Sequence, residues 1–246
     1  MGYSMNETAK KKTAIVTGAS SGIGKAIAHR LVKMGYEVYG IGRSFDEEEI
    51  PGFHHVICDL RETREMLAAI KRIVKTPGTE PEVLVNNAGS AYYGLHEELN
   101  PEKIQEMVRV NLEIPMVITQ QLLRILKENK GYIFNISSVT AISSNPHGAA
   151  YGATKAGLLS FGRSLFDEAR KYGIGVTSIL PDMTDTALYR NADFEADAAM
   201  DAHLEPEDAA DAVEYALSVR KGVCVPEIVI RPQLHRIKKK SRDFYR

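Results

Sequence analysis

Tryptophan is absent from this 246-residue sequence, cysteine occurs twice, and 31 basic residues against 32 acidic ones leave a formal charge of −1. Two cysteines cannot form a disulfide framework, and with no further ligands at close spacing we expect no metal site. The balanced charge argues against nucleic-acid binding. No apolar run approaches the roughly 18 residues of a membrane-spanning helix. We therefore expect a cytoplasmic protein that does not associate with a membrane.

Short β-branched runs alternate with amphipathic helical patterns along the whole chain. The strand candidates are Thr13–Thr17, Glu37–Ile41, His54–Cys58, Val83–Asn86, Gly131–Ser137, Gly175–Leu180 and Glu227–Ile230. The helical patterns cover residues 23–34, 62–75, 101–128, 151–172 and 206–219. Such alternation predicts a single α/β domain: a doubly wound, Rossmann-type parallel sheet of about seven strands with helices on both faces. Ligands of such sheets bind at the carboxyl ends of the strands.

A glycine-rich turn joins the first strand candidate to the first helical pattern, with the sequence TGASSGIG over residues 17–24. Glycines allow the chain to turn tightly and to approach a pyrophosphate at the helix N-terminus, where free amides bind anions. The spacing is GxxxGxG rather than GxGxxG. This turn predicts a dinucleotide site formed by Gly18, Ser20, Ser21, Gly22, Ile23 and Gly24.

The second strand candidate ends in Ile41-Gly42-Arg43. NAD-binding sites place an acidic residue near this point to accept hydrogen bonds from the ribose 2′-hydroxyl. Here Gly42 makes room for a 2′-phosphate and the Arg43 guanidinium can bind it. We therefore favour NADP(H) over NAD(H), the alternative being that Arg43 only caps a strand in solvent. Further cofactor contacts are expected at the ends of the third and fourth strands, from Asp59, Leu60, Asn87, Ala88 and Gly89.

Tyr151 and Lys155 are four residues apart within a helical pattern, so both side chains lie on one face of one turn. A free tyrosine titrates near pH 10 and is a poor acid or base at neutral pH. An adjacent ammonium favours the phenolate and lowers that pKa. Ser138, thirteen residues upstream of Tyr151, can hydrogen-bond the same substrate oxygen. Together these residues indicate proton transfer next to a dinucleotide site.

With these motifs in order, the chain closely resembles the short-chain dehydrogenase/reductases, in their single-domain branch of roughly 250 residues. The matching motifs are TGASSGIG at 17–24, NNAG at 86–89, Asn111, Ser138 and YGATK at 151–155. The resemblance covers about residues 12–232. It implies the fold already predicted and a nicotinamide cofactor.

The resemblance also implies a catalytic tetrad of Asn111, Ser138, Tyr151 and Lys155. Tyr151 would donate a proton to the carbonyl oxygen as hydride leaves the nicotinamide, and accept it in the reverse direction. Ser138 would orient and polarise the carbonyl. Lys155 would lower the pKa of Tyr151 and bind the nicotinamide ribose, so Tyr151 and Lys155 also count as cofactor contacts. Asn111 would anchor a water that links Lys155 to solvent.

One departure from the family pattern follows the sixth strand candidate. Pro181 and Thr186 match the family's cofactor contacts here, but Asp182 stands where the family usually has glycine. If this position needs a positive φ, aspartate tolerates it better than most residues. The alternative is that Asp182 points into the site and acts on substrate.

We expect residues 1–11 to be a flexible leader, 12–232 the catalytic domain, 183–205 a mobile lid over the substrate and 233–246 a basic tail. From 231 to 246 there are seven Lys or Arg residues and one Asp. We expect this end of the chain to form an intersubunit electrostatic contact or to be solvated. Tyr92 and Tyr93 are candidates for the substrate cavity, with core packing as the equal alternative. His147 is a further candidate, although a histidine in such a loop more often faces solvent.

The resemblance implies an NADP(H)-dependent carbonyl reductase or alcohol dehydrogenase, a homodimer or homotetramer, acting on a small carbonyl or alcohol. The runner-up is a 3-oxoacyl-thioester reductase of fatty-acid synthesis. Between residues 182 and 214, eleven acidic residues face one basic one. Such a field disfavours polyanionic thioesters and favours neutral or cationic substrates. A non-catalytic NADP(H)-sensing regulator is the alternative from another class, and the intact Tyr151 and Lys155 argue against it.

Overall fold

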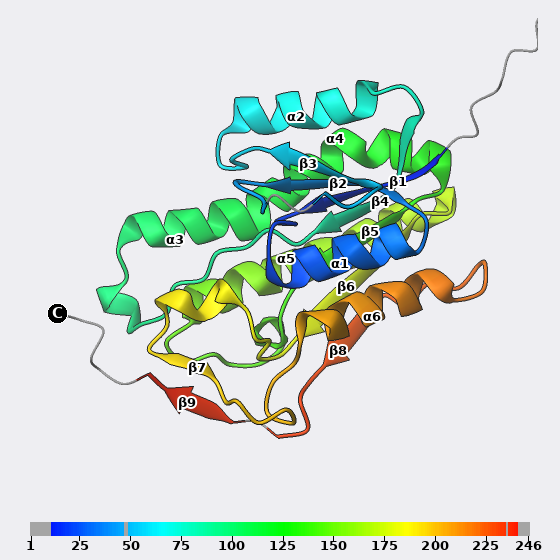
Figure 1. Cartoon of the computed structure of the whole chain (residues 1–246). Helices are drawn as coiled ribbons and strands as arrows, with labels where there is room; N and C mark the ends of the chain where they lie inside the picture. The colour runs from blue at the N-terminus through cyan, green and yellow to red at the C-terminus, as the bar shows by residue number, and fades with distance from the viewer. Residues whose placement is uncertain (1–10, 47–48, 235, 241–246) are drawn as a thin grey trace, which may run out of the picture.

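The computed structural model describes residues 11–46, 49–234 and 236–240 (Figure 1). Residues 1–10 of the expected leader lie outside this range, and Lys11 already belongs to the first strand. Seven strands form one sheet: β1 (Lys11–Thr17), β2 (Glu37–Gly42), β3 (Phe53–Ile57), β4 (Thr79–Asn86), β5 (Tyr132–Ile136), β6 (Gly175–Pro181) and β8 (Glu227–Ile230). All neighbours are parallel, in the order β3-β2-β1-β4-β5-β6-β8. The predicted doubly wound sheet is confirmed.

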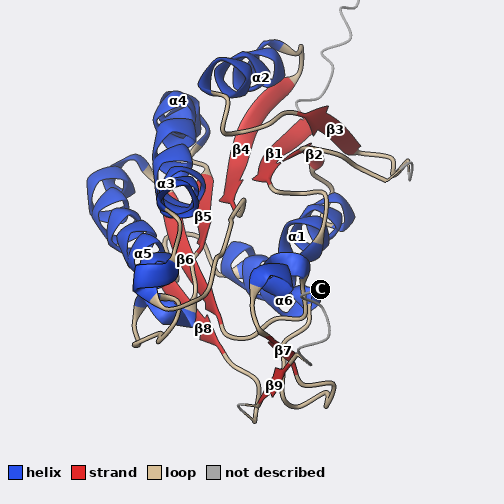
Figure 2. Cartoon of the chain, turned by 90° about the vertical axis from the view of Figure 1, so that its left-hand side faces the viewer, coloured by secondary structure: helices blue, strands red, loops and turns tan. Residues whose placement is uncertain are grey.

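The helices cover both faces of the sheet. In Figure 2, α2 (Thr63–Lys75), α4 (Ile114–Asn129) and α5 (Ala149–Ala169) lie on one side, and α1 (Gly22–Lys33) and α6 (Pro206–Ser218) on the other. The chain leaves β1 toward β2 and β3 and then crosses over to β4 on the other side of β1. This reversal between β1 and β4 is the switch point, where a ligand crevice is expected.

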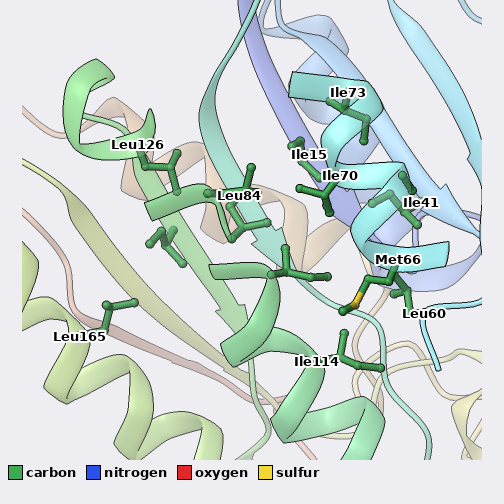
Figure 3. Packing of buried hydrophobic residues seen from close by; sticks show 14 of the residues in the cluster. Ile15, Ile41, Leu60, Met66, Ile70, Ile73, Leu84, Ile114, Leu126 and Leu165 are labelled. Carbon is green, nitrogen blue, oxygen red and sulfur yellow. The ribbon is translucent and has the colours of Figure 1, made fainter. Parts of the chain in front are cut away.

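Alternating strand residues supply two separate cores. Ile15 and Leu84 pack toward α2 and α4, where Figure 3 shows them against residues such as Met66, Ile70 and Leu126. Their strand neighbours, with Ala14, Val16, Val83 and Val85 among them, pack on the opposite face beside α1 and α6. Because both faces of these parallel strands are buried, the strands read as continuous apolar runs rather than alternating ones.

The helical pattern predicted over residues 101–128 is interrupted. Helix α3 (Pro101–Val108) is capped at its N-terminus by Asn100, whose side-chain oxygen accepts a 2.7 Å hydrogen bond from the backbone amide of Glu102. A π-helical turn (η2, Arg109–Glu113) then separates α3 from α4. Such turns are rare and are frequent at functional sites. Here the turn contains Asn111.

Short 3-10 turns occur at η1 (His96–Glu98), η3 (Val139–Ala141), η4 (Arg170–Tyr172) and η5 (Ala187–Asn191). Two further strands, β7 (Phe194–Ala196) and β9 (Ile237–Lys239), form an antiparallel pair outside the main sheet, at the bottom of Figure 1. This pair joins the expected lid to the basic tail of the same chain. Residues 237–239 are therefore held by backbone pairing within the chain and are exposed to solvent. The intersubunit contact or solvated end expected for the tail stays a prediction.

Candidate active site

A cavity of about 240 Å³ lies at the carboxyl ends of the central strands. Sixteen of the predicted site residues line it: Gly18, Ser20, Ser21, Gly22, Ile23, Arg43, Asp59, Leu60, Asn87, Ala88, Gly89, Ser138, Tyr151, Lys155, Pro181 and Thr186. Gly24 and Asn111 are buried behind this lining. The structure thus brings the glycine-rich turn and the Tyr–Lys pair into one cavity.

The glycine-rich turn fits a phosphate-bearing ligand. Gly18 and Gly22 have φ angles of 65° and 52°, which favour glycine. A Cβ on Gly24 would lie 2.1 Å from the carbonyl oxygen of Gly18, so only glycine lets the helix start so close to the turn. In the same cavity the buried hydroxyl of Ser90 has no hydrogen-bond partner within the described residues. An open glycine cradle and a free hydroxyl are what a polar cofactor needs.

Asn87 clamps this turn from the end of β4. Its side-chain nitrogen (Nδ2) donates to the carbonyl oxygens of Thr17, at 2.9 Å, and Gly18, at 3.1 Å. The Thr17 hydroxyl in turn accepts from the amides of Asn87 and Ala88, at 3.0 and 3.1 Å. Four hydrogen bonds therefore tie the two motifs together. Asn87 acts on the shape of the turn in addition to lining the cavity.

The end of β2 presents Arg43 to the cavity, exposed and beside Gly42, which packs on Ser20. Asp59, after β3, is held by Arg61: the guanidinium donates to its carboxylate at 2.7 and 3.1 Å. This hydrogen bonding lowers the pKa of Asp59, with a smaller contribution from the charge of Arg43. Arg61 also lines the cavity, and the sequence reasoning missed it. Its position two residues after Asp59 was the available signal.

Tyr151 and Lys155 lie in the first two turns of α5, both almost fully buried. The Lys155 ammonium donates a 2.8 Å hydrogen bond to the carbonyl of Ile136 and lies 5.7 Å from the centre of the Tyr151 ring. Burial lowers the pKa of Lys155 to about 8. Burial also raises the pKa of Tyr151, while a hydrogen bond with Ser138 opposes this. We expected Lys155 to control the pKa of Tyr151, but burial is the largest influence on the phenol.

Asn111 is fixed by its whole side chain. Its oxygen accepts from the Ser90 amide at 2.8 Å, and its nitrogen donates to the Ser90 carbonyl at 2.9 Å and to the Thr154 hydroxyl at 3.0 Å. Thr154 donates in turn to the Tyr151 carbonyl at 2.7 Å. A Cβ on Gly89 would lie 3.4 Å from the Asn111 oxygen and 3.7 Å from the Lys155 nitrogen, so both side chains flank Gly89. Asn111 thereby links the β4 loop to the turn that carries Tyr151.

Asp182 is not in a positive-φ turn, since Lys130 and His147 are the non-glycine residues with positive φ in the described chain. The preferred explanation for its place in the sequence is therefore wrong. Its carboxylate accepts a 2.8 Å hydrogen bond from the amide of Met183 and lies 3.5 Å from the Arg231 guanidinium. Asp182 lines the cavity, as the alternative explanation requires.

Aromatic side chains pack over Tyr151. Tyr93 lies 5.9 Å from the Tyr151 ring, 6.1 Å from Tyr189 and 5.0 Å from Phe194, measured between ring centroids. Tyr93 and Tyr92 both pack against the cluster that contains Tyr151, and Tyr92 is hydrogen-bonded to Glu106 at 3.2 Å. Neither lines the cavity, so both are packing residues rather than cavity walls. His147 is exposed.

Metal ligands and membrane spans were considered for the residues that the structure describes. These residues contain no group of three or more His, Cys, Asp or Glu side chains placed to bind a metal ion. No helix among them is long and apolar enough to cross a membrane. Both cysteines are free thiols, Cys58 buried and Cys224 partly buried.

Residues 12–196 match the profile of the short chain dehydrogenases. A curated oxidoreductase of Staphylococcus epidermidis, itself uncharacterized, is 33% identical over 235 residues, which cover 91% of this chain and 98% of the relative. The chain therefore belongs to the short-chain dehydrogenase/reductase family, as its motifs predicted, and is an oxidoreductase of that family.

Two solved structures with named activities share the fold. An alcohol dehydrogenase from the archaeon Thermococcus sibiricus, complexed with 5-hydroxy-NADP, is 26% identical with a TM-score of 0.81, covering 92% of this chain and 98% of that one. A 3-ketoacyl-(acyl-carrier-protein) reductase from Brucella melitensis, complexed with NADH, is 25% identical with a TM-score of 0.78, covering 91% and 98%. The two neighbours bind different nicotinamide cofactors, so cofactor preference is argued from this chain's own residues.

Proposed function

We propose that the protein is an NADP(H)-dependent carbonyl reductase or alcohol dehydrogenase acting on a small carbonyl or alcohol. The observation that carries the proposal is the single cavity lined by the glycine-rich turn, Ser138, Tyr151 and Lys155. When bound, the nicotinamide supplies or accepts the hydride. The protein's own residues bind that cofactor, orient the substrate oxygen and move the proton.

The preference for NADP(H) rests on the end of β2. Arg43 is exposed at the cavity edge, and Gly42 leaves no carboxylate there to repel a 2′-phosphate. Asp59, kept ionised by Arg61, is a fixed acceptor for an adenine amino group. The turn at residues 18–24 would hold the pyrophosphate, and Pro181 and Thr186 the carboxamide end.

In the proposed reduction, Tyr151 donates its phenolic proton to the substrate oxygen. Burial keeps the phenol protonated until an oxyanion develops beside it. Ser138 supplies a second hydrogen bond to that oxygen, which fixed donors stabilise best. Lys155 is protonated below about pH 8 and offers its remaining donors to a ribose. Asn111 holds Thr154 and the Ser90 loop, and its role as a water anchor stays a prediction.

A second candidate is a 3-oxoacyl-thioester reductase, favoured by the Brucella melitensis neighbour. The acidic composition of residues 182–214 argues against it, because such substrates carry polyanionic handles. We propose instead a neutral or cationic small-molecule substrate. A homodimer or homotetramer stays a prediction.

The test is oxidation of NADPH at 340 nm against ketones, aldehydes, diketones and acyl thioesters, with NADH in parallel. Tyr151→Phe removes the proposed proton donor, and Tyr172→Phe is the matched control, because Tyr172 is exposed and lies outside the cavity. Turnover in the wild type and the control, lost in Tyr151→Phe, supports the proposal. Turnover with thioesters alone favours the second candidate. Tight NADPH binding with no turnover at all favours a cofactor-sensing regulator.

A further inference from the structure

The end of the chain is bonded to the lid at several points. Strand β9 pairs with β7, and the Lys240 amide donates to the Asp193 carbonyl at 2.9 Å. The Lys240 ammonium donates to the Tyr189 carbonyl at 2.8 Å and lies 3.4 Å from the Arg190 carbonyl. In Figure 1 the red C-terminal strand runs beside the yellow lid segment. A residue 51 positions away thus caps the 3-10 turn η5.

Tyr189, the residue held by Lys240, is a wall of the cavity. Its phenol oxygen is hydrogen-bonded to the backbone of Thr184, so the residue is fixed at both ends. Burial raises the pKa of Tyr189 to about 12, which keeps the phenol neutral. A neutral aromatic wall suits an uncharged substrate substituent better than an anionic one.

The aromatic contacts continue from Tyr189 to the proposed proton donor. Tyr189 and Phe194 lie 5.6 Å apart, both pack on Tyr93, and Tyr93 packs on Tyr151. Phe194 belongs to β7, the strand paired with β9. Both lid aromatics are therefore held by residues 237–240: Phe194 through the pairing of β7 with β9, and the backbone of Tyr189 through the Lys240 side chain.

We propose that Lys240 is a positioning residue of the substrate cavity, which fixes Tyr189 and thereby limits the size of the substrate next to Tyr151. The proposal rests on the proposed reductase function. The Lys240 ammonium acts through Tyr189 and touches no reacting atom. Without it, the turn at residues 187–191 loses its cap and the aromatic wall moves away from Tyr151.

Hydrogen–deuterium exchange of the full-length chain tests the positioning without turnover. Lys240→Met should speed exchange of amides in residues 187–196 roughly tenfold, the effect of losing one hydrogen bond to a charged group, and Lys240→Arg should restore slow exchange. Lys239→Met makes the same charge change one position earlier, on an exposed side chain, and should leave exchange slow. Equal acceleration in both Met variants, or none in Lys240→Met, overturns the proposal.

Kinetics then test the size limit. Lys240→Met should raise the KM of a compact ketone roughly tenfold with little change in kcat, and improve the relative kcat/KM of a bulky cyclic ketone. Lys221→Met, an exposed lysine outside the cavity, is the activity control. An unchanged preference between the two ketones overturns the size limit. A wild type inactive on every ketone refutes the proposed function, and the exchange result still decides whether Lys240 holds the lid.

Discussion

The ammonium of Lys155 is buried beside the ring of Tyr151, 5.7 Å from its centre, and donates a 2.8 Å hydrogen bond to the carbonyl of Ile136. Burying an ammonium beside a neutral partner costs solvation free energy, and for this reason the pKa of Lys155 falls to about 8. The same burial raises the pKa of Tyr151. Burial therefore disfavours the charged form of both groups: it keeps the proton on the phenol and lets Lys155 lose its proton at a lower pH than a free lysine.

This geometry predicts how stability depends on pH. Below about pH 8 Lys155 is protonated in both the folded and the unfolded chain, and the burial cost is felt in full. Between about pH 8 and 10.5 the folded chain binds fewer protons, so the free energy of unfolding rises with pH. The total contribution is about 3 kcal/mol, at about 1.4 kcal/mol per pH unit.

Urea unfolding of the wild type and Lys155→Met at pH 7, 8, 9 and 10 measures this contribution. The lost hydrogen bond to Ile136 adds an offset that does not change with pH, so the difference between the two proteins is the relevant quantity. We expect the free energy of unfolding of the wild type to rise relative to that of the variant as the pH rises above 8. A difference that stays constant from pH 7 to 10 contradicts a lowered pKa.

Arg43 should determine cofactor choice. Because a charge-assisted hydrogen bond contributes about 2 kcal/mol, Arg43→Ala should lower kcat/KM for NADPH roughly 30-fold and change that for NADH by less than about threefold. Steady-state kinetics with both cofactors measure the ratio. Arg64→Ala is the control, since Arg64 is an exposed arginine outside the cavity. Equal losses with NADPH and NADH would assign Arg43 a structural role instead.

The sequence was sufficient where regular local backbone geometry dictates the residue type. The turn at 17–24 and the pair Tyr151 and Lys155 were predicted because local backbone geometry requires glycine, or one helix face, at those spacings. Arg61 was missed because its pairing with Asp59 depends on how the loop after β3 turns. The pairing of β7 with β9 joins segments about 40 residues apart, and no local periodicity records such a contact.

Burial was the other quantity that spacing alone did not provide. The four-residue spacing of Tyr151 and Lys155 suggested a lysine that lowers the pKa of the phenol. Tyr151 is buried, with Tyr93 packed on its ring, and this burial raises the pKa of the phenol instead. Asp182 shows the same limit: its missing glycine suggested a strained turn, and its backbone has no positive φ.

Asn87 should control cofactor affinity through the shape of the glycine-rich turn. Asn87→Ala removes two hydrogen bonds to Thr17 and Gly18, at a cost of about 2 kcal/mol in stability, and should weaken NADPH binding at least tenfold. Asn129→Ala is the matched control, because Asn129 also donates to a backbone carbonyl, that of Pro81, but outside the cavity. Calorimetric titration with NADPH should detect the loss in Asn87→Ala alone. Equal affinities in the two variants would mean that the turn keeps its shape without the clamp.

Two substitutions of Asp182 distinguish the contribution of its hydrogen bond to the Met183 amide from that of its negative charge. Asp182→Asn keeps an oxygen for the Met183 amide and loses the charge pairing with Arg231, which is half-exposed and contributes less than about 1 kcal/mol. Asp182→Gly loses the hydrogen bond as well and adds backbone freedom, so it should cost about 2 kcal/mol. Urea unfolding should therefore rank the wild type and the Asn variant close together and the Gly variant below both. If the Asn variant is as unstable as the Gly variant, the negative charge rather than the turn explains why aspartate replaces the family's glycine.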